Sequence, residues 1–301
     1  MLSRVHVRVP ATSANLGPGF DCLGMALDLW NTVTLERGRE GVTITGEGAD
    51  RIRRDQGNLV VRAVNVVFQR IGAIPPPMAF TCHNVIPMSR GLGSSSAAIV
   101  GGLVAGNALC GSPLTEQDLL NLAAEQEGHP DNVTPALLGG CQIAVHEGGK
   151  VVASRVPLPP GLSAVLFIPT MPMPTAKARA VLEPNVARED AVYNIGRAAL
   201  LVNAFATGRL DALDVATRDR LHQPQRERIF PQMRLLFRAA RQAGALGVFL
   251  SGAGSTILAL TAGKEMTIAY EMAEEARKAS LEGNVLITKP TEQGAQVVSV
   301  E

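Results

Sequence analysis

A glycine- and serine-rich turn, Gly-Leu-Gly-Ser-Ser-Ser at residues 91–96, separates a predicted strand from an apolar run, 97–109, that is best explained as a buried helix. The first N–H groups of a helix have no partner within it, and the helix dipole favours an anion there. Glycines let a phosphate approach the backbone, and serine hydroxyls add donors or a magnesium ligand. Local sequence alone is equally compatible with a turn that merely caps the helix.

Several known nucleotide-binding motifs are absent from this turn and from the chain, and their absence excludes the corresponding classes of protein. No lysine follows its last glycine, so it is not a Walker A loop, and a dinucleotide-binding fingerprint would need glycine where Ser96 stands. The His-Arg-Asp and Asp-Phe-Gly motifs of protein kinases are absent. An anion site of another kind is therefore indicated.

Composition excludes other classes of protein. Only 4% of the 301 residues are aromatic against 46% apolar, so the core is expected to consist of aliphatic side chains. A net charge of +1 without a basic tail gives no electrostatic reason to expect nucleic acid or an anionic membrane as a partner. The cysteines show no metal-ligand spacing, and the N-terminus alternates apolar with polar residues, unlike a secretory signal. We expect a cytoplasmic protein without a membrane span.

Periodicity and turn residues indicate mixed helices and strands. Val5, Val7 and Val9 alternate with polar residues and predict a strand that Pro10 ends. Thr115 and Asp118 have the spacing of a helix capping box. Other predicted elements of the first half are strands at 32–36, 42–45 and 80–85 and a helix at 59–71.

The second half indicates an antiparallel α+β layer. A proline-rich segment, 157–161, is the best candidate for a domain boundary. After it we predict strands at 164–168, 247–251, 255–260 and 284–288 and helices at 190–207, 210–221, 232–243 and 264–281. Strands that alternate with helix pairs favour helices on one face of an antiparallel sheet.

Two further loops are rich in small residues. Residues 12–21, Thr-Ser-Ala-Asn-Leu-Gly-Pro-Gly-Phe-Asp, follow the first strand, and Asn15 or Asp21 could simply be turn residues. Residues 251–256, Ser-Gly-Ala-Gly-Ser-Thr, join two apolar runs and, taken alone, favour a tight hairpin.

Together the three loops resemble the three motifs of the GHMP small-molecule kinases, over essentially the whole chain. The first motif, residues 10–21, is similar to that of the branch that phosphorylates L-homoserine. Two further segments are also similar to segments of that branch: Glu-Gly-His-Pro-Asp-Asn-Val at 127–133 and Leu-His-Gln-Pro at 221–224. Mevalonate and galactose kinases have a first motif with Gly-Glu-His, which is missing here.

The resemblance implies a GHMP kinase fold of class α+β. Residues 1–157 would form an N-terminal nucleotide-binding domain like ribosomal protein S5, and residues 158–301 a C-terminal ferredoxin-like domain. It implies transfer of the γ-phosphoryl group of ATP, with Mg²⁺, to the side-chain hydroxyl of L-homoserine, on the route to threonine. It also implies a homodimer.

The resemblance also implies roles for individual residues. Ser95 and Glu125 match magnesium ligands, and with Asp131 they form the expected catalytic set. Around the amino acid it implies Asn15, Asp21, His129, Asp131, Thr175, Arg179 and Arg226. Around the nucleotide it implies Asn58 and the phosphate loop, Pro87, Met88, Ser89, Arg90, Gly91, Leu92, Gly93, Ser94, Ser95, Ser96 and Ala97.

These roles agree with the chemistry. Phosphoryl transfer depends on positioning and charge neutralisation more than on a strong base. Arg179 and Arg226 suit an α-carboxylate, and Asp21 suits an ammonium group. Related kinases often pair the catalytic aspartate with a lysine, but the first 149 residues contain none, so we expect Asp131 to orient the hydroxyl.

Plainer interpretations remain open at this stage. Glu125, three residues after Leu122 and so expected on its inward face, could be a solvated carboxylate at a helix end. His129 could be a turn residue, and Arg179 could pair with Glu183 on the surface. Two rival functions are a non-catalytic sensor of ATP and a metabolite, and a kinase for another alcohol such as mevalonate, for which Asp21 would be an awkward like charge.

Overall fold

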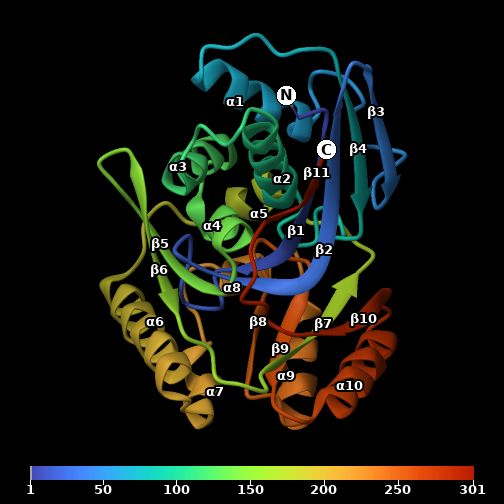
Figure 1. Ribbon diagram of the computed structural model, residues 1–301. Helices are drawn as coiled ribbons and strands as arrows, with labels where there is room; N and C mark the ends of the chain where they lie inside the picture. Colours follow the sequence, from blue (N-terminus) through green and yellow to red (C-terminus); the bar gives the residue numbers. More distant parts are fainter. Residues whose placement is uncertain (1) are drawn as a thin grey trace.

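The computed structural model describes residues 2–301, which build two sheets with helices packed on both (Figure 1). The first sheet has the order β11-β1-β2-β4-β3, and β5 extends it by pairing with β2 and β6. Neighbouring strands are antiparallel except β3 and β4. Its strands are β1 (Arg4–Ala14), β2 (Leu23–Arg37), β3 (Gly41–Gly46), β4 (Met78–Asn84), β5 (Cys141–Glu147), β6 (Lys150–Val156) and β11 (Gln296–Val300).

Four helices pack on the first sheet. The apolar helix α2 is enclosed by α1 on one side and by β1 and β2 on the other, which explains why 12 of its 16 residues are buried. The capping box of Thr115 and Asp118 begins α3. The helices are α1 (Leu59–Arg70), α2 (Ser94–Leu109), α3 (Glu116–Glu127) and α4 (Pro130–Leu138).

The second sheet is antiparallel in the order β10-β7-β9-β8, the order of a ferredoxin-like fold, and both of its faces are covered. Along β7, Ala164 and Leu166 belong to the core shared with the first sheet, and Val165 and Phe167 to a second core under α9 and α10. The strands are β7 (Ser163–Pro169), β8 (Gly247–Leu250), β9 (Ile257–Thr261) and β10 (Gly283–Thr288), and the helices α9 (Met233–Gln242) and α10 (Glu265–Lys278).

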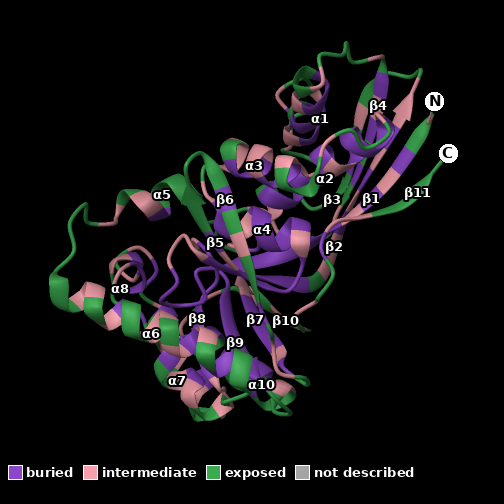
Figure 2. Ribbon diagram, turned by 60° about the vertical axis from the view of Figure 1, so that its left-hand side comes forward, coloured by how far each residue is buried: buried purple, intermediate pink, exposed green. Residues whose placement is uncertain are grey.

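A helical segment between β7 and α9 lies beside both sheets. It contains the long helix α6, and short helices at either end of the segment lie near the first loop and the third motif. In Figure 2 the buried residues gather around α4 and the strands below it, while much of α6 is exposed. The helices are α5 (Thr175–Ala180), α6 (Arg188–Thr207), the 3-10 turn η1 (Leu210–Ala212), α7 (Leu213–Ala216) and α8 (Gln223–Arg226).

Several expectations about elements need correction. The first strand continues through Pro10 to Ala14, because a bulge between Pro10 and Ala11 accommodates the proline. The helix expected at 210–221 is replaced by η1 and α7. The last strand, β11, pairs with β1, so a division at residue 157 does not assign whole sheets to the two halves of the chain.

Candidate active site

The three small-residue loops meet at one place and are hydrogen-bonded to one another. The Ser251 hydroxyl donates to the carbonyl of Gly91 at 2.6 Å and, having only one proton, accepts from the Ser13 hydroxyl at 2.8 Å. The N–H of Gly252 donates to Ala14, and that of Thr256 donates to Arg90, both at 3.0 Å. Segments that are about 240 residues apart in sequence therefore form one rigid surface.

Glycines allow this close approach. Gly91 has a φ of +75°, and a Cβ there would lie 2.0 Å from the carbonyl oxygen of Ser251. Gly93 has a φ of +70°, and its Cβ would lie 1.9 Å from the Thr12 hydroxyl. Side chains at these two positions would push the phosphate loop away from the other loops.

We expect Gly91→Ala to lower the free energy of unfolding by about 2–4 kcal/mol, because it adds a clash with fixed backbone to the strain of a positive φ. Gly72→Ala is the matched control: its φ is +68°, but a Cβ there meets nothing within 4 Å. Urea unfolding of both variants separates the two effects. Equal losses in the two variants would contradict the role assigned to the contact with Ser251.

A cavity of about 490 Å³ lies beside the meeting point of the loops. One part of its wall comes from β3, β4 and the start of α1, including the apolar side chains of Ile44, Leu59 and Val60. The phosphate loop and the start of α2 form another part. The remaining wall contains all seven residues expected around the amino acid, Asn15, Asp21, His129, Asp131, Thr175, Arg179 and Arg226.

Helix α2 presents free donors to this cavity. Its N-cap, Gly93, provides no side-chain cap, and the first hydrogen bond of the helix runs from the N–H of Ala97 to the carbonyl of Gly93 at 2.8 Å. The amides of Ser94 and Ser95 therefore remain available where the dipole favours an anion. Both residues line the cavity.

The carboxylate beside Ser95 belongs to Glu127 and not to Glu125. The hydroxyls of Ser95 and Ser96 donate to Glu127 Oε1 at 2.6 and 3.0 Å. Glu127 lines the cavity, whereas Glu125 is exposed and does not. Two residues of helix correspond to a rotation of about 200°, so the two carboxylates point to different sides of α3. The expectation for Glu125 was therefore wrong in its geometry.

The side chain of Arg90 does not line the cavity. Its guanidinium donates to the backbone carbonyls of Pro169, Met88 and Thr170 and so ties the phosphate loop to the end of β7. Burial lowers the pKa of Arg90. Three other members of the expected phosphate loop, Pro87, Ser96 and Ala97, also lie outside the cavity wall.

Asp21 and Arg179 form a bidentate ion pair in the wall. Arg179 Nη2 and Nη1 lie 2.6 and 3.0 Å from the two carboxylate oxygens of Asp21. The side chain of Asn15 accepts from the N–H of Asp21 and donates to Gly252, which holds the first loop against the third motif. The hydrogen bond and the charge of Asp21 raise the pKa of Arg179.

Arg226 is a second, deeply buried cation. Its guanidinium donates to the carbonyl of Gly252 at 2.9 Å and lies 5.6 Å from the centre of the Phe20 ring, which Arg179 approaches to 5.5 Å. Burial lowers the pKa of Arg226 to about 10, and the charge of Arg179 acts in the same direction. Arg226 nevertheless remains protonated at neutral pH. Two arginines therefore lie beside Asp21, and Asp131 adds a second carboxylate to the same wall.

His129 and Asp131 lie at the start of α4. His129 Nδ1 is 2.7 Å from Asp131 Oδ1, and the Asp131 carboxylate is almost fully buried. Burial acts to lower the pKa of His129, but the bond to Asp131 and the charges of Asp131 and Glu127 outweigh it, so the pKa is raised. The pair can hold or share a proton next to the cavity.

Asn58 and Thr175 both line the cavity. Asn58 caps α1 by accepting from Val60 and donates to Arg53, so both of its polar atoms are engaged. Thr175 begins α5, whose Arg179 reaches Asp21. Asn58 and Thr175 therefore lie in the wall because α1 and α5 begin there.

Four residues that contribute to the site were not predicted from the sequence. These are Glu127, Thr12, Asn132 and Phe20. The Thr12 hydroxyl donates to Asn132 at 2.8 Å, which joins the first loop to α4. All four stand within motifs already singled out, at 12–21 and 127–133, and Glu127 is separated from buried Ala123 by four residues, a helical spacing that could have identified it.

Comparison with known proteins finds two matching family models. The family model for the N-terminal domain of GHMP kinases matches residues 58–140, and the model for the GHMP kinase C-terminal region matches residues 201–279. In residues 2–301, no helix has both the length and the apolar character needed to cross a bilayer.

Relatives that match over nearly the whole chain include homoserine kinases. The chain is 46% identical to the homoserine kinase of Moorella thermoacetica, covering 97% of this chain and 99% of that one, and 43% identical to that of Caldicellulosiruptor saccharolyticus, covering 99% and 97%. The crystal structure of homoserine kinase from Cytophaga hutchinsonii matches with a TM-score of 0.90 at 30% identity, over 99% of this chain and 98% of that chain. This chain belongs to the GHMP kinase family.

Proposed function

We propose that this chain transfers the γ-phosphoryl group of ATP to the side-chain hydroxyl of L-homoserine and forms O-phospho-L-homoserine, a step toward threonine. The observation that carries the proposal is one cavity wall that combines the free amides of α2 with an Asp21–Arg179 pair and the buried cation Arg226. Free amides bind phosphate, and this arrangement of charges suits a zwitterionic amino acid.

The triphosphate would lie along the phosphate loop, with the base against the apolar wall of Ile44, Leu59 and Val60. Backbone N–H groups at the start of α2 neutralise phosphate charge without a lysine, in agreement with the absence of lysine from the first 149 residues. Arg90 contributes by fixing the loop through its hydrogen bonds to Met88 and Pro169.

The donor set around Ser95 fits a magnesium ion. Mg²⁺ prefers oxygen ligands and usually binds through one or two protein groups plus substrate phosphates and water. The Ser95 hydroxyl and the Glu127 carboxylate, 2.6 Å apart, provide two such oxygens. In residues 2–301 there is no group of three or more His, Cys, Asp or Glu side chains that could hold a metal ion by itself. A bound magnesium ion would neutralise charge on the transferring phosphate.

The amino acid would insert between the charges that now pair with each other. Its ammonium group suits Asp21 and its carboxylate suits Arg179 and Arg226, so binding replaces one ion pair with two. Because Arg226 is buried, its contact with a carboxylate is screened little by solvent.

Asp131 would orient the reacting hydroxyl. Its carboxylate is held by His129 and lies at the N-terminal turn of α4, where the dipole favours an anion. A loose transition state needs orientation more than proton removal, so the proton can pass to a phosphate oxygen or to solvent. Asp131 therefore works by positioning the nucleophile.

The cellular setting is proposed on more general grounds. The four cysteines, Cys22, Cys82, Cys110 and Cys141, are unpaired, which suits a reducing cytoplasm. Likeness to the family favours a homodimer, and analytical ultracentrifugation is the direct measurement of that state. A monomer at micromolar concentration would contradict the proposed dimer and leave the proposed reaction untouched.

A coupled assay of ADP release with a panel of alcohols tests the proposed reaction. We expect kcat/KM for L-homoserine to exceed that for L-serine, L-threonine and mevalonate by at least about 100-fold. The reason is that a good substrate must match the site in both of its charges and in the distance from those charges to its hydroxyl. Preference for mevalonate would identify a different alcohol kinase. Stoichiometric ATP binding without turnover of any alcohol would identify a sensor, and either result would overturn the proposal.

A further inference from the structure

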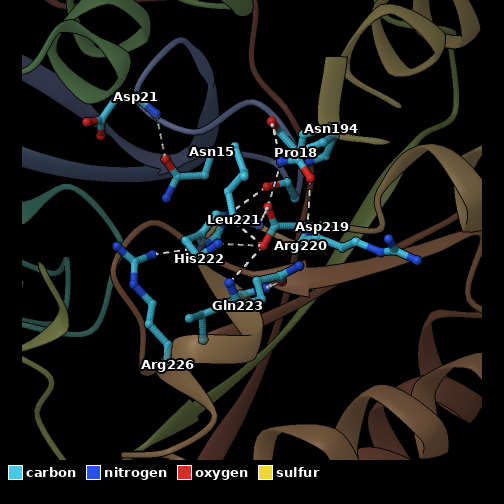
Figure 3. Close-up of polar contacts among 12 residues, drawn as sticks. Asn15, Pro18, Asp21, Asn194, Asp219, Arg220, Leu221, His222, Gln223 and Arg226 are labelled. Atoms are coloured by element: carbon cyan, nitrogen blue, oxygen red, sulfur yellow. Dashed lines mark hydrogen bonds and ion pairs between the residues drawn. The ribbon is translucent and has the colours of Figure 1, made fainter. Parts of the chain in front are cut away.

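His222 is a fully buried histidine whose two ring nitrogens contact two different parts of the site (Figure 3). Its Nδ1 lies 2.9 Å from Arg226 Nη1, and its Nε2 lies 2.7 Å from the carbonyl oxygen of Gly17. A guanidinium only donates and a carbonyl only accepts, so these partners assign the neutral tautomer with the proton on Nε2. Burial also lowers the pKa of His222.

The backbone that carries His222 is fixed by a buried carboxylate. Asp219 accepts the N–H groups of residues 221–223 at distances of 2.7 to 3.0 Å, and the side-chain amide of Asn194 at 2.7 Å. Asn194 also donates to the carbonyl of Pro18 at 3.2 Å, and Figure 3 shows this network around the labelled residues. The imidazole is therefore anchored to the first loop through both its backbone and its ring.

The acceptors around Arg226 are all uncharged. Nη1 donates to His222 and to Gly252, and Nε donates to the carbonyl of Ala178 at 3.4 Å. Within residues 2–301, Nη2 makes no hydrogen bond. A carboxylate in the place of His222 would neutralise the guanidinium, whereas neutral acceptors hold its direction and leave its charge to an anionic ligand.

We propose that His222 is a positioning residue that aims the guanidinium of Arg226 at the carboxylate of the amino-acid substrate. The carbonyl of Gly17 sets the tautomer, and the tautomer provides the lone pair that holds Arg226 Nη1. This role rests on the proposed function, because it assigns Arg226 to the substrate carboxylate. It adds to that function a buried histidine that holds Arg226 in place without neutralising its charge.

Two substitutions separate the ring's two contacts. In His222→Asn the amide oxygen stands two bonds beyond Cβ, as Nδ1 does, so the acceptor for Arg226 is kept and the donor to Gly17 is lost. In His222→Gln the amide nitrogen stands three bonds beyond Cβ, as Nε2 does, so the donor to Gly17 is kept and the acceptor is lost. Each variant removes one buried hydrogen bond, so their melting temperatures are expected to be similar.

Steady-state kinetics then distinguish positioning from stability. We expect His222→Gln to raise the KM for homoserine by about tenfold or more and His222→Asn by no more than about threefold, with the KM for ATP nearly unchanged in both. In an Arg226→Leu background, His222→Gln should add no more than about twofold. Equal KM values in the two single variants, or a further tenfold rise in the double variant, would overturn the proposal.

Turnover of homoserine by the unchanged chain is measured first. Its absence would contradict the proposed function itself. Intact turnover combined with equal effects of the two substitutions would contradict only the role of His222. The two failures are therefore distinguishable in one set of assays.

Discussion

Replacing Glu127 by Gln is expected to lower kcat by about 100-fold or more and to raise the Mg²⁺ concentration that gives half the maximal rate. The amide keeps the shape of the side chain and can still accept from Ser95, but the anionic ligand is lost. Magnesium titrations at saturating ATP and homoserine measure both changes. A lower kcat with an unchanged magnesium midpoint would contradict the metal role and leave a role in orienting Ser95.

Glu125→Gln is the matched control on the same helix. Because Glu125 is exposed and outside the cavity wall, we expect its kcat and magnesium midpoint to stay within about twofold of the unchanged chain, as for an ordinary surface substitution. If Glu125→Gln caused the loss and Glu127→Gln did not, the assignment drawn from the geometry of α3 would be wrong.

Arg226→Leu is expected to raise the KM for homoserine by about 100-fold, which corresponds to one or two charge-assisted hydrogen bonds to a carboxylate. The KM for ATP should change by less than about threefold, since the carboxylate lies away from the transferring phosphate. Initial rates over a matrix of both substrate concentrations separate the two constants.

Arg228→Leu controls for the loss of an arginine from the same segment. Arg228 is exposed and pairs with Glu183 at 3.1 Å on the surface, so its removal should leave both KM values nearly unchanged. Thermal unfolding reports how far the loss of the hydrogen bond from Arg226 to Gly252 destabilises the fold. Equal increases in the KM for ATP and for homoserine in Arg226→Leu would indicate a role in folding or in nucleotide binding.

The fold was largely predictable where periodicity was strong. The alternation of Val5, Val7 and Val9 gave β1, and the apolar run in the second half gave β7. The hairpin of β5 and β6 was missed although Gly148 and Gly149 stand between two alternating runs, a recognised hairpin signal. The return of β11 to β1 was not predictable, because no local pattern specifies a pairing between segments about 290 residues apart.

The loops that form the candidate site could be predicted from the sequence. The arrangement of individual side chains within it was less predictable. Asn15, Asp21 and Arg226, which stand in or beside the recognised motifs, line one cavity. The assignment of Glu125 failed because the partly exposed Leu122 had been used to define the inward face of α3. The buried residues of that helix, Leu120, Ala123 and Ala124, define the face on which Glu127 lies.

The pairing of β11 with β1 limits how the enzyme can open and close. The chain passes from the first sheet to the second after β6 and returns after β10, and the returning segment 289–295 is hydrogen-bonded to β2 and α4. Two separate crossings, one of them anchored along its length, restrict rotation of the two sheets relative to each other. We therefore expect admission and release of substrate to come from smaller moving parts, such as the segment carrying α5, which lines the cavity and whose Arg179 pairs with Asp21.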